Sequence, residues 1–164
     1  METRNGRSVV YLGAGLGLVF ALFAAAEFLD PSLSSVCSVS SSISCGKVLS
    51  SGDTTTLWIP DFVWGIAGFV AILVLAALAE QRPDDRRRAY ALLGLTSAGV
   101  ALALYLLYVE LAVIHALCPV CAGAYLLGAV AWGGSIELVR RASDESHADA
   151  DDDDETPDDP DADR

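Results

Sequence analysis

Four long apolar stretches, separated by shorter polar segments, run along this chain. They cover approximately residues 8–29, 59–79, 90–114 and 119–139, and a helix needs about 20 apolar residues to cross the hydrocarbon core of a bilayer. Because a helix satisfies its own backbone hydrogen bonds, it is one of the few structures that can span a membrane. The pattern therefore predicts an all-α integral membrane protein, a bundle of four transmembrane helices with a long loop between the first and the second.

Composition sets the C-terminal end apart from the remainder of the chain. Of the 164 residues, 53% are hydrophobic, which is too many for an ordinary water-soluble domain. The formal net charge is −12, but residues 144–164 carry 12 of the 22 acidic residues and leave the rest of the chain near −1. We therefore expect a membrane domain over residues 1–143, a disordered acidic tail over residues 144–164, and no nucleic-acid partner.

Basic residues gather on one side of the predicted bundle. Two precede the first stretch, four lie between the second and the third, and two directly follow the fourth. In chain order they are Arg4, Arg7, Arg82, Arg86, Arg87, Arg88, Arg140 and Arg141. On the other side only Lys47 stands, in the loop of about residues 30–58. Short cytoplasmic loops retain Lys and Arg, so both termini are expected in the cytoplasm of a cell-membrane protein, with the loop outside. The first stretch shows no cleavage site of a signal peptide and is expected to stay as a membrane anchor.

The four cysteines all fall at the outer face in this topology, where disulfides can form. Cys37 and Cys45 lie in the loop, whereas Cys118 and Cys121 open the fourth helix. Two cysteines three residues apart on one helical turn are close enough to bridge, and a helix N-terminus favours a thiolate. Pro119 suits a first helical position, so Cys118 should take the cap position and Cys121 should point into the bundle.

Other uses of four cysteines remain open at this point. Two structural disulfides would stabilise a small external loop, although a Cys-x-x-Cys in a membrane wall is a poor place for one. A structural zinc site fits badly, because seven residues separate the first pair. Unrelated cysteines of a small transporter are the third alternative.

A redox relay is the interpretation that the placement favours most. A loop pair can meet water-soluble proteins, while a pair at the membrane boundary can meet a lipid-soluble electron carrier, and exchange between them proceeds through a mixed disulfide. The natural lipid-soluble acceptor is a quinone of the menaquinone or ubiquinone type, held between helices near Cys121. The sequence contains no Gly-x-Gly-x-x-Gly and no P-loop that would indicate a nucleotide instead.

These residues resemble the vitamin K epoxide reductase family over roughly Ala26 to Trp132, in the form without a fused thioredoxin-like domain. The resemblance rests on both cysteine pairs, the run from Trp58 to Gly65, and Tyr125. It implies that Cys121 faces the quinone, that Cys118 exchanges with Cys45, and that Cys37 with Cys45 takes electrons from a separate thioredoxin-fold protein.

Two further residues are expected to bind the quinone. Tyr125 lies on the same helical face as Cys118 and Cys121, and the resemblance implies a hydrogen bond from it to a quinone oxygen. Asp61 stands where the family commonly has Asn, so it serves either as a protonated donor to the other oxygen or as a simple helix cap.

Two acidic residues, Glu27 and Glu110, fall near the outer helix ends. Both can be read as snorkelling to the interface, but Glu110, eight residues before Cys118, can also be read as a source of protons for the quinone. The expected function is that of a membrane thiol:quinone oxidoreductase that supports disulfide formation. Reduction of vitamin K epoxide or of a quinone for its own sake, and a non-enzymatic disulfide-stapled scaffold, are the alternatives.

Overall fold

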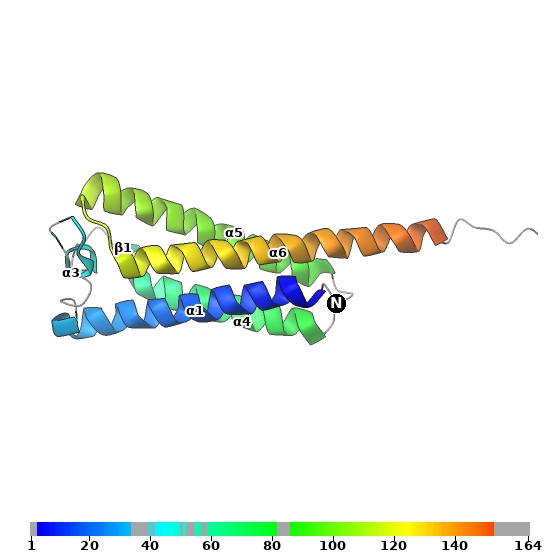
Figure 1. Cartoon of the computed structure of the whole chain (residues 1–164), viewed down its shortest axis with the longest axis horizontal. Helices are drawn as coiled ribbons and strands as arrows, with labels where there is room; N and C mark the ends of the chain where they lie inside the picture. Colours follow the sequence, from blue (N-terminus) through cyan, green and yellow to red (C-terminus); the bar gives the residue numbers. More distant parts are fainter. Residues whose placement is uncertain are drawn as a thin grey trace, which may run out of the picture.

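The computed structural model describes residues 3–33, 40, 42–49, 51, 55–56, 59–81 and 86–152. Figure 1 shows four long helices arranged as a bundle, with the short elements that follow α1 gathered at one end. Around the bundle, α1 packs against α6 and α4, and α5 packs against α6 and α4. The elements in chain order are α1 Thr3–Leu29, the 3-10 turn η1 Pro31–Leu33, α3 Cys45–Leu49, β1 Thr55–Thr56, β2 Ile59–Pro60, α4 Asp61–Gln81, α5 Arg86–Val109, the π-helical turn η3 Glu110–Ile114, and α6 Pro119–Asp152.

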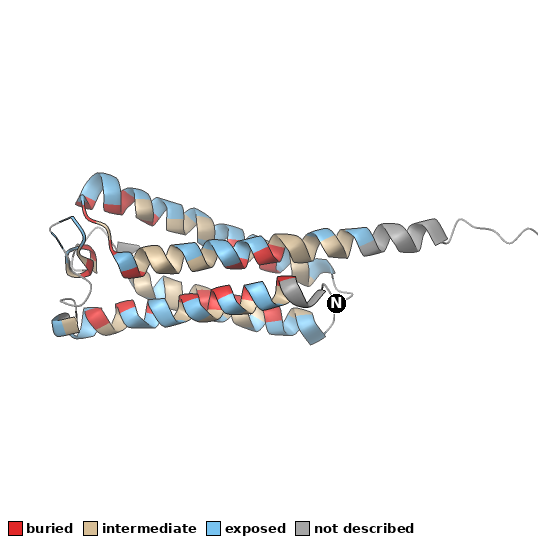
Figure 2. Ribbon diagram, in the orientation of Figure 1, coloured by how far each residue is buried: buried red, intermediate tan, exposed pale blue. Residues whose placement is uncertain are grey.

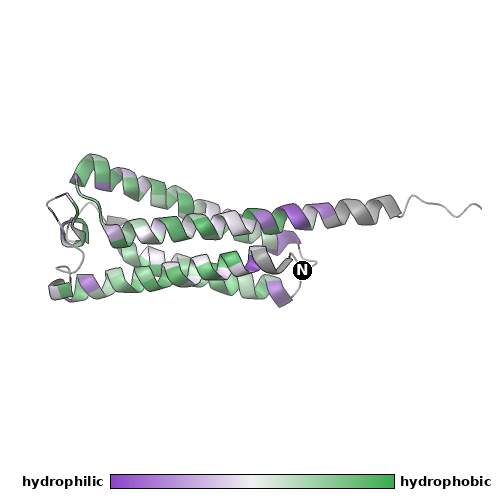
Figure 3. Ribbon diagram, viewed as in Figure 1, coloured by the Kyte–Doolittle hydropathy of each residue, from purple (hydrophilic) through white to green (hydrophobic). Residues whose placement is uncertain are grey.

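The outer surface of the bundle is apolar, as contact with lipid requires. Four helices in the described part of the chain are long and apolar enough to cross a membrane. Large apolar side chains point away from the bundle, and Leu12, Leu104 and Leu126 expose 63%, 63% and 70% of their surface. Figure 2 shows exposed residues along the long helices, and Figure 3 shows that most of the bundle is hydrophobic. So large an apolar surface does not suit water, and the predicted bundle of four transmembrane helices is confirmed.

The second membrane helix begins at Asp61, two residues later than the apolar pattern predicts. Ile59 and Pro60 instead form β2, which pairs antiparallel with β1. The residue before a proline is disfavoured in helical conformation, and proline itself is tolerated best at the start of a helix. Hydrophobicity continues through this point, but the backbone chemistry of proline delays the helix.

The last helix is much longer than its apolar part. The sequence predicts a span ending near residue 139 and a disordered tail from residue 144, whereas α6 continues to Asp152. Extending a formed helix costs far less than starting one, and Arg141 forms a 2.7 Å ion pair with Glu137 one turn earlier. The remaining tail, residues 153–164, lies outside the described residues.

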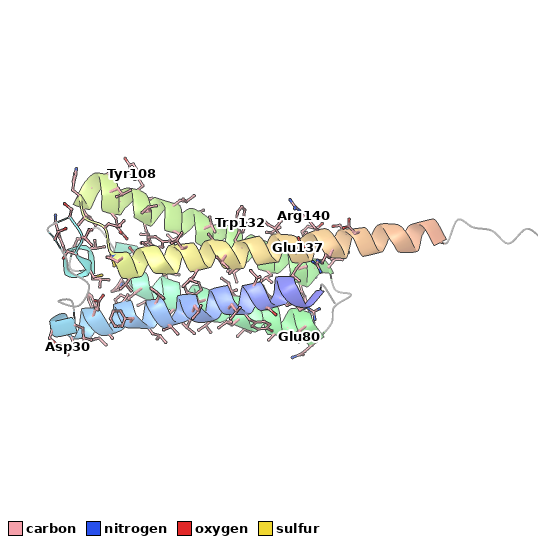
Figure 4. The ribbon with its side chains drawn as sticks, viewed as in Figure 1. Asp30, Glu80, Tyr108, Trp132, Glu137 and Arg140 are labelled. Atoms are coloured by element: carbon pink, nitrogen blue, oxygen red, sulfur yellow. The ribbon has the colours of Figure 1, made fainter. Side chains whose placement is uncertain are left out.

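The two ends of the bundle differ in their chemistry. Figure 4 places Asp30 and Tyr108 at the end where α3 lies, and Glu80, Glu137 and Arg140 toward the other end. The cysteines of α3 and of the start of α6 thus lie at the end far from Arg140. We call the end of the bundle where α3 and the start of α6 lie the cysteine end.

Candidate active site

The candidate site begins where α5 stops being an α-helix. Its last turn widens into the π-helical segment η3, and the backbone oxygen of Glu110 accepts the N–H of His115 and that of Ala116, the latter at 3.1 Å. His115 has a φ of 53°, the left-handed conformation that commonly ends a helix. These features turn the chain back across the end of the bundle toward α6.

A short backbone ladder then joins this turn to the loop that follows α1. The N–H of Leu117 donates to the oxygen of Ser42 at 2.9 Å, and the N–H of Ser44 donates to the oxygen of Leu117 at 3.1 Å. Cys45 and Cys118 each follow this ladder by one residue. Their Sγ atoms consequently lie 3.3 Å apart, although 73 positions separate them in the chain.

Cys118 caps α6, as the sequence predicts. The helix begins at Pro119, and the N–H of Cys121 donates to the Sγ of Cys118 at 3.2 Å. This cap holds the Sγ of Cys118 at the start of α6, next to the Sγ of Cys45.

The cysteines of the site are present in two oxidation states. Cys118 and Cys121 are free thiols, whereas Cys45 is disulfide-bonded. Cys37 lies outside the described residues, so its pairing with Cys45 stays a prediction. Cys45 and Cys118 are both 0% exposed and belong to an apolar cluster with Val48, Val109 and other side chains. Water is thus kept from the place where two sulfur atoms could exchange.

A cavity of about 320 Å³ lies next to the thiol of Cys121. Residues of all four long helices line it, most of them apolar, and its size falls within the range of small-molecule sites, about 300–1,000 Å³. Four of its polar or ionisable lining residues, Asp61, Glu110, Cys121 and Tyr125, lie toward the cysteine end, whereas Thr96 lines it from the middle of α5. An apolar pocket with a few convergent polar groups is what a quinone ring with two carbonyl oxygens requires.

Glu110 has a more central place than the sequence indicates. It is 1% exposed, and its Oε1 accepts the hydroxyl of Tyr125 at 2.7 Å while its Oε2 accepts the N–H of Cys118 at 3.0 Å. Snorkelling to the interface is therefore wrong for Glu110. Its position within an apolar stretch and shortly before the cysteine pair was the sequence signal for a buried role.

The predicted site residues thus fall into two groups. Cys45, Cys118 and Cys121 meet at the cysteine end, and Asp61 and Tyr125 line the cavity beside Cys121. Cys37 and Trp58 lie outside the described residues. Glu27 is 3% exposed, so it does not snorkel either.

A known protein family matches most of the chain. The family model described as "Vitamin K epoxide reductase family" matches residues 8–135, which is more than half of the chain and includes the described cysteines and the cavity. Members of this family are membrane oxidoreductases that generally use a quinone as electron acceptor. The chain therefore belongs to the vitamin K epoxide reductase family.

Proposed function

We propose that this protein is a thiol:quinone oxidoreductase that reoxidises a thioredoxin-fold protein outside the membrane and so supports disulfide formation. Electrons enter at the loop pair Cys37 and Cys45, pass to Cys118 and Cys121, and leave on a quinone in the cavity. The quinone is of the menaquinone or ubiquinone type.

The position of Cys118 is the observation that carries this proposal. Its Sγ lies 3.3 Å from that of Cys45 on one side and accepts the N–H of Cys121 on the other. Cys121 in turn lines the cavity. One sulfur atom therefore stands between the loop and the pocket, as an electron relay between a protein partner and a lipid-soluble acceptor requires.

The exchange steps balance in thiols and electrons. A reduced partner protein reduces the disulfide of the loop pair and leaves with a disulfide of its own. The Cys45 thiolate then attacks Cys118 in the Cys118–Cys121 disulfide and expels Cys121, and Cys37 attacks Cys45 and expels Cys118. The reduced Cys118 and Cys121 finally give two electrons and two protons to the quinone and close their disulfide again.

The distribution of charge supports an external location for this chemistry. Arg7, Arg86 and Arg140 belong to the end of the bundle away from the cysteines. Bases of short loops stay in the cytoplasm, so the cysteine end and its loop would face outward. A separate thioredoxin-fold protein would reach the loop there.

Asp61 and Tyr125 are the proposed ligands of the two quinone oxygens. Both line the cavity with Cys121. A quinone oxygen only accepts hydrogen bonds, so Asp61 would have to be protonated to bind it. An ionised Asp61 would instead act as an N-terminal residue of α4, where a carboxylate interacts well with the helix dipole.

The redox state of the thiols in cells tests this function against a stapled scaffold. Cells with quinone and cells depleted of it are quenched with acid, and free thiols are tagged with a maleimide that adds mass. We expect disulfides in both pairs when quinone is present and free thiols at Cys118 and Cys121 after depletion, with reoxidation when quinone is restored. Cysteines of a scaffold would keep one state throughout, and that result would contradict the proposal.

A further inference from the structure

The hydroxyl of Tyr125 has one proton to donate, and in the structure Glu110 accepts it. Tyr125 donates to Oε1 of Glu110 at 2.7 Å. A quinone oxygen has no proton and can only accept. While Glu110 accepts this bond as a carboxylate, Tyr125 therefore cannot donate to a quinone in the cavity.

A proton on Glu110 reverses the direction of this hydrogen bond. A protonated carboxyl group has an O–H of its own, which can donate to the oxygen of Tyr125. The hydroxyl proton of Tyr125 is then available to the cavity that both residues line. The protonation state of Glu110 thus decides whether Tyr125 can bind and protonate a quinone.

Glu110 also lies close to the thiol pair that releases protons when it is oxidised. Its Oε2 accepts the N–H of Cys118 at 3.0 Å, which ties the carboxyl group to the start of α6 and to the thiol pair. With 1% exposure it has little access to water. Closure of a disulfide between Cys118 and Cys121 releases two protons together with the two electrons, and reduction of a quinone consumes the same number.

We infer that Glu110 takes up one of these protons and delivers it to a quinone oxygen through the hydroxyl of Tyr125. In the delivery step the Glu110 O–H bond breaks and its proton joins the oxygen of Tyr125, while the Tyr125 O–H bond breaks and that proton joins the quinone oxygen. Glu110 is left as a carboxylate and is reloaded when the thiols are next oxidised. This inference rests on the proposed function, and the second proton takes a route outside this pair.

Substitution by glutamine separates proton delivery from hydrogen bonding. In Glu110→Gln the amide oxygen can still accept the N–H of Cys118, and the amide N–H₂ can donate to Tyr125, which leaves the tyrosine hydroxyl free for quinone. We expect quinone affinity within about twofold of wild type but a rate of quinone reduction lower by about 10²-fold, a typical loss for a missing proton donor. The matched control is Glu27→Gln, because Glu27 is a second buried acid near the same end among the described residues, and the rate of this variant should stay within about twofold of wild type.

Tyr125→Phe gives a second and independent route to the same question. It should reduce the rate of quinone reduction by a factor similar to that of Glu110→Gln, because both residues serve one proton path. The double variant should then be no slower than the slower single variant, since residues that act as a unit are not additive. Losses that multiply in the double variant would overturn the inference.

Infrared difference spectroscopy supplies a readout that needs no quinone. When a chemical oxidant closes the disulfide between Cys118 and Cys121 in the purified protein, we expect the C=O band of a protonated carboxyl group to grow. The band should be missing in Glu110→Gln and kept in Glu27→Gln. A wild-type spectrum without it, or a band that survives in Glu110→Gln, would overturn the inference.

The outcomes also separate this inference from the proposed function. If reduced wild-type protein does not reduce quinone at all, the proposed function fails. If wild type reduces quinone and Glu110→Gln does so at a rate within about twofold of it, the proposed function stands and the role of Glu110 is refuted.

Discussion

A variant that keeps one cysteine of each pair, Cys37→Ser with Cys121→Ser, should form a disulfide between Cys45 and Cys118. Their Sγ atoms lie 3.3 Å apart. A disulfide needs about 2.05 Å, so the sulfur atoms have to approach by about 1.3 Å. Since the thermal displacement of a well-ordered atom is about 0.9 Å, small rotations of both side chains cover most of this distance and no helix has to move.

The expected yield is high because nothing competes with this bond. In Cys37→Ser alone or Cys121→Ser alone, one cysteine pair is still complete. Its own disulfide competes with the Cys45 to Cys118 bond, which therefore accumulates only in part. In the double variant a preference of about 1.4 kcal/mol for the bonded form already gives about a tenfold excess over the open form. We therefore expect about nine in ten chains to carry the Cys45 to Cys118 disulfide after mild oxidation.

The assay compares two variants that differ in which cysteine of the second pair they keep. Purified protein is oxidised for a limited time, remaining thiols are tagged with a mass label, and the linked peptides are identified by mass spectrometry. The matched control, Cys37→Ser with Cys118→Ser, leaves Cys45 and Cys121 and should oxidise at least about tenfold more slowly, because the Sγ of Cys118 lies beside that of Cys45 whereas Cys121 lines the cavity. Equal rates in the two variants, or free thiols at both positions in the first, would refute the relay through Cys118.

The other predictions concern packing, the second quinone ligand and orientation. Gly13→Ala should destabilise the protein by about 1–3 kcal/mol in thermal unfolding, because its Cβ would lie 2.8 Å from a backbone nitrogen of α6. Gly15→Ala meets nothing within 4 Å and should be neutral or stabilising, so equal losses would contradict the packing argument. If Asp61 donates to the quinone, Asp61→Asn should keep the KM for quinone and Asp61→Ala should raise it several-fold, for about 1–2 kcal/mol of lost hydrogen bonding; identical KM values would leave Asp61 as a helix cap. An impermeant maleimide added to intact cells should label Lys47→Cys and spare Arg140→Cys, and the reverse pattern would overturn the proposed orientation.

The sequence predicts the membrane helices well because their signal is local. About 20 consecutive apolar residues leave the backbone few ways to cross a bilayer. The helix ends were harder to predict, because hydrophobicity does not determine them. Pro60 delays the start of α4 within an apolar run, and α6 continues as a helix to Asp152 in acidic sequence.

In the site, too, the sequence predicts features that depend on neighbouring residues but not contacts between distant segments. The cap by Cys118 follows from neighbouring residues, so the sequence could predict it. The contact between Cys118 and Cys45 depends on the ladder between Leu117 and the loop residues Ser42 and Ser44, and two serines in a polar loop carry no signal for such pairing. The burial of Glu110 depends in the same way on how the π-helical turn aims its side chain at α6.

The central claim is that both cysteine pairs pass their electrons to quinone. The most direct test is to count the quinone molecules that one reduced chain consumes. Purified protein is fully reduced, freed of reductant without oxygen, and mixed with excess quinone, and the loss of quinone is followed by absorbance. Each pair holds two electrons, so the relay predicts about two quinones reduced per wild-type chain and about one per chain of Cys45→Ser. One quinone per wild-type chain, with the loop pair still reduced, would contradict the relay.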